Sequence, residues 1–212
     1  MKELIILMSW HKEADPGKIA AFEENYSSFK TYNPGVEIIT VMNYFTEPKR
    51  AWLSTDLVLF NWYINNHECY PARRYLLIEW DCWCDCKIED YFSRVWDCNL
   101  VVPTVKYPER DDWYWFQTIN QLPQESRVYA TGISPLCAIL ISDEAMDAIS
   151  KEINKPEYES LNSEIRFGTI ATMLNYDPVV NPVYNRSIGW RFPSPFDNKI
   201  PGLHHPRKKI TS

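Results

Sequence analysis

The sequence predicts an α/β fold in which helices cover both faces of a central, mostly parallel mixed sheet. Three observations favour this fold. Apolar runs of strand length alternate along the chain with segments whose apolar residues recur at helical spacing. The run over residues 75–78 is apolar throughout, which is typical of a strand buried on both faces. With 212 residues, the chain is long enough to bury the core of one such domain.

The elements of residues 1–105 are expected to alternate between strand and helix. Residues 4–8 form a short apolar run, and the strand predicted there is followed by Asp15 and Pro16, which suit the N-cap and first turn of a helix. Later segments of this half are either β-branched, as in strands, or apolar at every third or fourth residue, as in helices. The remaining expected strands cover 36–44, 75–78 and 99–105, and the remaining helices cover 53–64 and 90–96.

Residues 106–176 form a mixed second half in this prediction. Ser142 and Asn162 are favourable N-cap residues, and each precedes a segment of helical periodicity. The aromatic segment over 112–119 suits either a helix or a loop. Strands are expected over 127–131 and 137–141, and helices over 142–153 and 162–175. Prolines recur through residues 177–212, which are therefore expected to form an extended tail that packs back over the domain.

The composition argues against several classes of protein. Only six glycines occur, all far apart, which rules out the glycine-rich loops that bind dinucleotides or triphosphates. A formal net charge of −6 with no basic half argues against a general nucleic-acid-binding protein. Neither a signal peptide nor an apolar run of membrane-spanning length is visible, so we expect a soluble, cytoplasmic protein. The six cysteines, three of which alternate at Cys82, Cys84 and Cys86, are expected to be free thiols.

Two carboxylates follow the strand predicted at 75–78. Glu79 and Asp81 flank Trp80, and residues two apart on an extended segment point the same way, so both carboxylates can face one cation. Hard oxygen ligands suit Mn²⁺ or Mg²⁺, and a metal can bridge an acidic protein to a diphosphate. Asp85 is a competing ligand. The alternative interpretation is a strand that simply becomes polar as it reaches the surface.

The tail holds a second set of candidate site residues. His204 and His205 are adjacent, and a neutral imidazole is a good ligand for Mn²⁺. The basic cluster Arg207, Lys208 and Lys209 can neutralise a diphosphate leaving group. The alternative interpretation is a solvated, frayed C-terminus in which these residues have no role.

These pieces resemble the GT-A-fold, nucleotide-sugar-dependent glycosyltransferases, whose Rossmann-like domain carries an Asp-x-Asp motif at the end of a central strand. Residues 75–81 resemble that strand and motif, with Glu79 in place of the first Asp. Because glutamate is longer than aspartate, Glu79 contacts either the metal or only a ribose or water. A C-terminal histidine that binds metal in many members matches His204 or His205. The resemblance implies a UDP-sugar donor, Mn²⁺ or Mg²⁺ as cofactor, and transfer of the sugar to a glycan or glycoprotein acceptor.

The second half resembles the acceptor side of the same family. Residues 132–134 and 137–142 resemble its acceptor-side strand, and residues 162–166 resemble a helix start whose acid faces the reacting sugar. In its size and its C-terminal histidines, the chain also resembles the retaining UDP-sugar enzymes related to xylosyl- and galactosyltransferases. It is also similar to the N-terminal glycosyltransferase domain of a chlorella-virus capsid-glycan enzyme, which implies retention, a host-cytoplasmic location and further domains beyond this one.

The resemblance also divides the chain and assigns residue roles. Residues 1–105 are the expected nucleotide-binding half, 106–176 the acceptor-side half and 177–212 the tail that closes over the site. Glu164 is the candidate catalytic carboxylate, or alternatively a helix N-terminal acid that favours the dipole. Asp112 is the second catalytic candidate, beside an aromatic run that forms either an acceptor platform or core. The nucleotide-binding residues expected are Ser9, Trp10, Arg73, Arg74, Glu79, Trp80 and Lys208.

Three other functions remain open at this point. A sugar-phosphate nucleotidyltransferase shares the fold and the metal chemistry, but it usually has a glycine-rich N-terminal loop, which this chain lacks. A non-catalytic carbohydrate-binding module would explain the aromatic residues, but such modules are usually all-β. A zinc site built from Cys82, Cys84, Cys86 and His67 fits the usual ligand spacing poorly.

Overall fold

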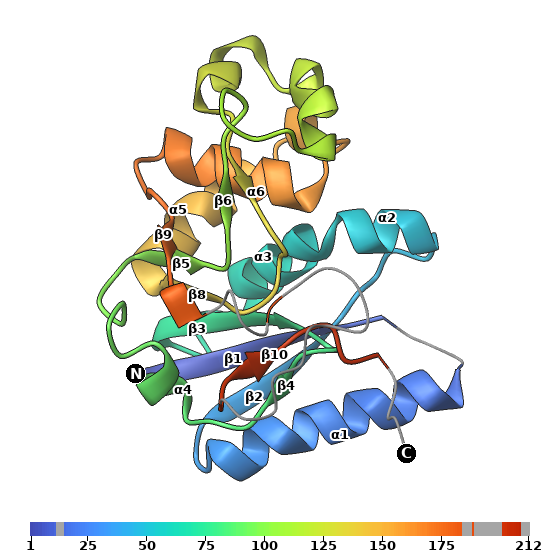
Figure 1. Cartoon of the computed structure of the whole chain (residues 1–212), viewed down its shortest axis with the longest axis vertical. Coiled ribbons are helices and arrows are strands. Elements are labelled where there is room, and N and C mark those ends of the chain that lie inside the picture. Colours follow the sequence, from blue (N-terminus) through green and yellow to red (C-terminus); the bar gives the residue numbers. More distant parts are fainter. Residues whose placement is uncertain (12–14, 184–187, 189–200, 209–212) are drawn as a thin grey trace.

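The computed structural model describes residues 1–11, 15–183, 188 and 201–208. In these residues a six-stranded mixed sheet has the order β2-β1-β3-β8-β5-β9, with helices on both of its faces (Figure 1). All neighbouring strands are parallel except β8, which runs antiparallel to β3 and β5. The predicted α/β class with a mostly parallel mixed sheet is therefore confirmed.

The strands of the central sheet come from both halves of the chain. The first three strands are the longest, and β1 lies between β2 and β3 and is parallel to both. Two small antiparallel sheets lie outside the central one and pair β10 with β4 and β6 with β7. The strands are β1 (Lys2–Trp10), β2 (Glu37–Met42), β3 (Ala72–Glu79), β4 (Trp83–Cys84), β5 (Leu100–Val102), β6 (Val105–Lys106), β7 (Gly132–Ile133), β8 (Ile139–Ser142), β9 (Val179–Val180) and β10 (Leu203–His204).

Three of the helices begin at the caps that the sequence predicts. Asp15, Ser142 and Asn162 each accept a hydrogen bond from a backbone N–H of the first turn that follows, which satisfies one of the otherwise unpaired donors there. The helices are α1 (Pro16–Tyr32), α2 (Pro48–Leu53), α3 (Thr55–Asn66), α4 (Ile88–Tyr91), α5 (Asp143–Ile153) and α6 (Ser163–Met173). The 3₁₀ helices are η1 (Tyr114–Gln121), η2 (Gln124–Tyr129) and η3 (Pro156–Tyr158).

Strand alternation divides the core into two layers. Ile5, Leu7 and Leu77 face one side of the sheet, where α3, α5 and α6 cover it. Ile6 and Leu76 face the other side, where α1 and α4 cover it. The central strands are buried on both faces, and their carboxyl ends form one edge of the sheet.

Some predicted elements differ from the structure. Residues 127–131 are not a strand, because Arg127 donates hydrogen bonds to the carbonyls of Leu122 and Asn120, and this curls the segment into η2. Val128 in that segment is 82% exposed, so a strand there would have nothing to pack against. The strand predicted over 99–105 divides into β5 and β6. Most of the helix predicted over 90–96 is turn, since α4 already ends at Tyr91.

The described part of the tail packs back onto the domain, as predicted, since β10 pairs with β4. The rest of the predicted tail, including Lys209, lies outside the described residues. All six cysteines are free thiols. No helix in the described residues is long and apolar enough to cross a membrane.

Candidate functional site

The candidate site lies at the carboxyl edge of the sheet, where β1 and β3 end together. Ser9 near the end of β1 is in register with Glu79, the last residue of β3. The chain turns immediately after β3, and the N–H of Cys82 donates to the carbonyl of Glu79 at 3.0 Å. Asp81 lies within this turn. The first elements of the chain therefore place two carboxylates at one end of a buried strand.

An imidazole from the tail lies between these carboxylates. The Nε2 atom of His205 is 3.1 Å from Oε2 of Glu79 and 3.2 Å from Oδ1 of Asp81. The side chains of Asp81 and His205 are almost fully buried, and that of Glu79 is 17% exposed. We call Glu79, Asp81 and His205 the carboxylate–histidine group.

Backbone contacts hold the tail in this position. The N–H of Arg207 donates to the carbonyl of Asp81 at 2.6 Å. The buried Nδ2 of Asn25 in α1 donates to the carbonyls of Trp80 and Arg207, both at 3.1 Å. Asn25 thus connects the β3 turn to the tail. Nothing in the local sequence of α1 distinguishes Asn25, so the sequence analysis missed it.

The two adjacent histidines have different partners. In β10, His204 is paired with Trp83, and its Nε2 lies 3.2 Å from Oδ1 of Asp85. The same Asp85 oxygen accepts the N–H of Gly202. Of the two histidines and three carboxylates considered from the sequence, the structure therefore groups His205 with Glu79 and Asp81, and it groups His204 with Asp85.

Opposite charges stabilise the ionised forms within the group. Burial alone would raise the pKa of Asp81, but His205 and Lys208 together hold it below its ordinary value. Burial works against a charged imidazole at His205, yet Cys137, Asp81 and Glu79 together hold its pKa well above the ordinary value. The group therefore pairs the ionised carboxylate of Asp81 with a positively charged His205 imidazole. A bound metal cation can take over that positive charge when the imidazole loses its proton.

The donor set fits a divalent metal. One ligand atom from each member of the carboxylate–histidine group lies within 4.8 Å of the others. Two carboxylate oxygens and one imidazole nitrogen suit Mn²⁺, and also Mg²⁺ with water completing its shell. The cysteines form no such group in the described residues. His67 stacks on Tyr63 in α3, on the other face of the sheet from Cys82 and Cys84, so these residues do not build the zinc site considered above.

Glu164 lies in the first turn of α6, near this group. Its N–H is bound by the Asn162 cap, and its Oε1 accepts the Ser134 hydroxyl at 2.5 Å. Burial raises the pKa of Glu164 to about 7, since the Ser134 hydrogen bond and the charge of His205 only partly offset desolvation, and Glu79 adds to it. The structure thus places the predicted catalytic carboxylate within electrostatic reach of the carboxylate–histidine group. Ser134 belongs to the segment 132–134 that resembles the acceptor-side strand, and its hydroxyl orients this carboxylate.

The remaining basic residues of the tail have separate roles. The Nζ atom of Lys208 lies 3.7 Å from Oδ2 of Asp81, and its side chain is half exposed. The Arg207 guanidinium instead binds Glu24 at 2.8 Å and lies over the Trp83 ring. Lys208 is therefore the tail cation that the described structure leaves beside the site.

Three further expected nucleotide-binding residues lie at the same edge as Glu79 and Lys208. Ser9 is buried, and its hydroxyl makes no hydrogen bond within the described part of the chain. Trp10 stacks on Phe22 with ring centroids 4.3 Å apart and meets Trp80 edge to face at 5.3 Å. Trp10 and Trp80 are thus largely occupied by each other and by α1, whereas the buried Ser9 hydroxyl is a polar group without a partner in the described residues.

Arg73 and Arg74 are placed elsewhere. They lie at the amino end of β3, roughly 15–20 Å along the strand from Glu79. Arg74 donates to the carbonyl of Cys98 and lies over the Trp96 ring, whereas Arg73 pairs loosely with Glu3 on the surface. The structure does not bring either arginine to the carboxyl edge, because a strand separates its two ends by its whole length.

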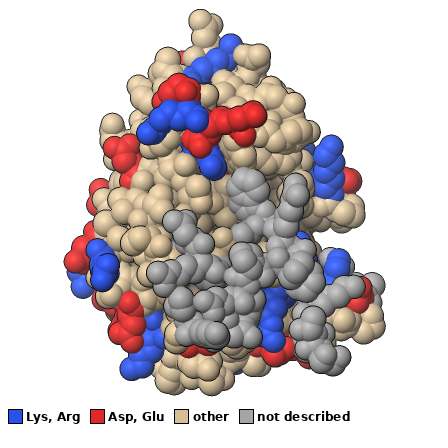
Figure 2. Space-filling view, viewed as in Figure 1, with Lys and Arg blue, Asp and Glu red and all other residues tan. Residues whose placement is uncertain are grey.

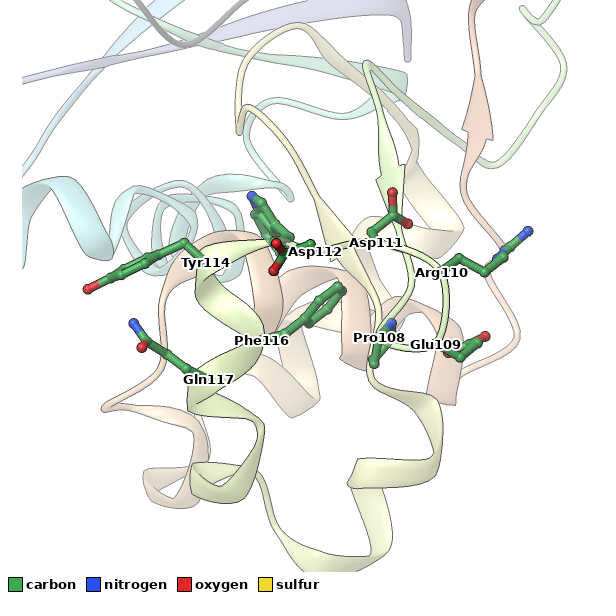
Figure 3. Close-up of a pocket in the computed structure, with 9 residues that line it drawn as sticks. Pro108, Glu109, Arg110, Asp111, Asp112, Tyr114, Phe116 and Gln117 are labelled. Carbon is green, nitrogen blue, oxygen red and sulfur yellow. The ribbon is translucent and has the colours of Figure 1, made fainter.

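Asp112 lies outside the carboxylate–histidine group as well. It lines a pocket formed by residues between positions 108 and 117, which we call the loop pocket (Figure 3). The aromatic run beside Asp112 was expected to form either an acceptor platform or part of the core, and its residues differ in this respect. Trp113 and Phe116 pack against the core, Trp115 is partly buried, and Tyr114 is 69% exposed.

The comparisons with known proteins concern the fold. No protein-family model matches the chain, and no curated protein matches its sequence. Among solved structures, it is similar to a glycosyltransferase involved in the glycosylation of the major capsid of PBCV-1, with 12% identity, a TM-score of 0.53, and 84% of this chain and 81% of that chain covered. It is also similar to mouse xyloside xylosyltransferase 1, with 12% identity, a TM-score of 0.50, and 84% of each chain covered. At this identity the likeness shows a shared fold.

Proposed function

We propose that this protein is a metal-dependent glycosyltransferase that moves a sugar from a UDP-sugar to a glycan or glycoprotein acceptor, with retention. The observation that carries the proposal is the carboxylate–histidine group at the carboxyl edge of a sheet of the glycosyltransferase fold. In open α/β sheets, ligands bind beyond the carboxyl ends of the strands, which is where this group lies. Glu164 lies beside it and supplies a further carboxyl group.

The carboxylate–histidine group is the metal site in this proposal. Glu79, Asp81 and His205 would hold Mn²⁺ or Mg²⁺, which supplies Lewis-acid stabilisation of the departing diphosphate. The half-exposed ammonium of Lys208 contributes positive charge to the same leaving group. The buried hydroxyl of Ser9 at the end of β1 provides a hydrogen bond for the nucleoside portion of the donor.

Glu164 is the carboxyl group that acts at the reacting sugar. Its pKa of about 7 means that it exchanges a proton near neutral pH, as suits a group that transfers a proton to or from a reacting hydroxyl. The Ser134 hydrogen bond fixes the direction of one oxygen and leaves the other available. Retention is proposed from the family resemblance, and NMR of the newly formed anomeric bond decides between retention and inversion.

The first experiment is a calorimetric titration with UDP in the presence and absence of Mn²⁺, with GDP and CMP as controls. We expect UDP to bind selectively and only with Mn²⁺. Asp81→Asn removes the negative charge of a proposed metal ligand. The affinity for UDP with Mn²⁺ should therefore fall by more than about 100-fold, because even the loss of a residue that only hydrogen-bonds to a metal ligand costs about 10–100-fold. Asp97→Asn is the matched control, because the Asp97 side chain is fully exposed.

Two outcomes would contradict the proposal. If no nucleotide binds with metal, the donor site does not exist at this edge. If the protein instead releases pyrophosphate from a nucleoside triphosphate and a sugar phosphate, it is a nucleotidyltransferase. Selective UDP binding followed by sugar release from one UDP-sugar in a donor screen is the expected result.

A further inference from the structure

The loop pocket is a second candidate binding site, outside the carboxylate–histidine group. It is an open depression of about 620 Å³, lined by polar and aromatic residues of the β6–η1 connection and of η1. On the face shown in Figure 2, acidic and basic side chains lie together on the upper lobe, where Figure 1 places β6, η1 and η2. This volume is in the range of sites that hold small organic ligands.

Some polar groups of the lining have partners within the protein and others do not. Asp111 accepts the Lys106 ammonium at 3.2 Å and the N–H of Tyr107 at 2.8 Å, and Arg110 stacks on the Tyr107 ring. Within the described residues, the side chains of Asp112 and Gln117 make no hydrogen bond. The loop is therefore braced by Asp111, while a carboxylate and an amide remain available to a ligand.

The aromatic side chains give the pocket flat apolar surfaces. Tyr114 is 69% exposed, and Figure 3 shows it pointing to the same side of η1 as Gln117, whereas Phe116 points toward Pro108. Tyr114 also meets Trp115 edge to face, with ring centroids 5.0 Å apart. Trp115 in turn lies 5.9 Å from Trp52 of α2, which is 55% exposed. An aromatic surface therefore continues from the pocket toward α2.

The pocket is connected to Glu164 through β7. A Cβ added at Gly132 would lie 2.1 Å from the Trp113 ring, so this ring packs directly on Gly132. Ser134, two residues later, donates to Glu164. Alternate residues of an extended segment share a face and lie about 7 Å apart. The Trp113 wall of the pocket and the Glu164 carboxyl are therefore both in contact with the short segment 132–134.

We propose that the loop pocket is the acceptor subsite and that it binds an uncharged oligosaccharide. Exposed aromatic rings beside a carboxylate and an amide suit the apolar faces and hydroxyl groups of a sugar. The carboxylates of Glu109, Asp111 and Asp112 outnumber the Arg110 guanidinium in the lining, and this negative balance disfavours acidic or phosphorylated acceptors. This inference rests on the proposed function, because it makes Glu164 the group that meets the acceptor hydroxyl.

The test is binding to an array that carries neutral di- to hexasaccharides, sulfated and uronic-acid oligosaccharides, and unglycosylated peptides. The wild-type protein should bind neutral oligosaccharides alone. Titration with the strongest of these should show at least a tenfold loss of affinity in Tyr114→Ala and a smaller loss in Gln117→Ala. Tyr32→Ala is the matched control, because Tyr32 is an exposed tyrosine at the end of α1. Thermal unfolding of each variant checks that it is folded.

The inference is overturned if only peptides or acidic oligosaccharides bind, or if the pocket variants bind neutral oligosaccharides as Tyr32→Ala does. A titration with UDP and Mn²⁺ on the same samples tests the proposed function separately. If the pocket variants lose oligosaccharide binding and no sample binds UDP, the pocket is an oligosaccharide site, but both the transferase and the acceptor role of the pocket are rejected. UDP binding without any oligosaccharide binding rejects the pocket and leaves the transferase standing.

Discussion

The carboxylate–histidine group and the loop pocket differ in how the fold builds them. The first combines the end of β3 with a tail more than 120 residues later in the chain, and its members are mostly buried. The second is formed by one continuous stretch of chain, and much of it is exposed. The buried group depends on the whole fold, whereas the pocket depends mainly on a braced loop.

This difference predicts different responses to substitution. Charges that are removed from water interact strongly and shift one another's pKa values, so changes at the edge should alter chemistry and stability together. An exposed aromatic side chain can be removed without leaving a buried cavity or charge. Substitutions on the pocket surface should therefore affect acceptor binding alone, and substitutions beneath it should also affect stability.

The largest effect is expected from Glu164→Gln. This change removes the titrating oxygen while keeping the size of the side chain and a partner for Ser134. Turnover with the UDP-sugar and acceptor should fall by about 10²–10⁴-fold, as is usual when a group that transfers a proton is lost. The affinity for UDP with Mn²⁺ should not change. A variant that keeps most of its turnover would show that Glu164 serves only as an N-terminal acid of α6.

The two histidines offer a sharper comparison within the edge itself. His205→Ala should reduce Mn²⁺-dependent UDP affinity by at least about 10–100-fold, since it removes a ligand of the proposed metal. His204→Ala should have a much smaller effect, because this ring binds Asp85 and not the carboxylate–histidine group. Calorimetry on both variants measures the contrast. If both variants lost the same UDP affinity, the two histidines would matter only because they hold the tail against the domain. His205 would then not be a metal ligand.

The pKa of Glu164 predicts a pH dependence of stability. The carboxyl is protonated up to about pH 7 in the folded protein but only up to about pH 4.5 when unfolded. The folded state therefore binds more protons between these values, and the free energy of unfolding falls as pH rises through this window. The loss is roughly 3 kcal/mol. Denaturant unfolding at pH 5 and pH 8 in the presence of a chelator measures it, and this contribution should be absent in Glu164→Gln.

The smallest effect is expected beneath the loop pocket. Gly132→Ala places a methyl group against the Trp113 ring, which must move together with the pocket wall. We expect a destabilisation of about 1–3 kcal/mol, as for overpacking in other cores, together with weaker binding of neutral oligosaccharides. Gly17→Ala is the control, because the nearest atom to its added Cβ is the side-chain oxygen of Asp15 at 3.2 Å. Wild-type stability and binding in Gly132→Ala would show that Trp113 does not depend on this contact.

Local patterns predicted much of the fold. The caps Asp15, Ser142 and Asn162 and the buried strand that ends at Glu79 are properties of short segments, in which side-chain spacing and backbone hydrogen bonding decide the structure. The segment at 127–131 was predicted wrongly because its β-branched and aromatic residues lack a neighbouring strand. Whether such a segment is a strand depends on a partner that the local sequence does not contain.

The sequence by itself determined that two carboxylates follow a buried strand and that an acid opens α6, since both follow from local periodicity and capping. It left His204 and His205 as equal candidates. Only the tertiary structure decided between them, through the pairing of β10 with β4. Adjacent residues of an extended segment point to opposite sides, so a shift of one residue in this register would exchange the two histidines. That register is fixed by contacts between residues more than 100 positions apart, such as His204 with Asp85.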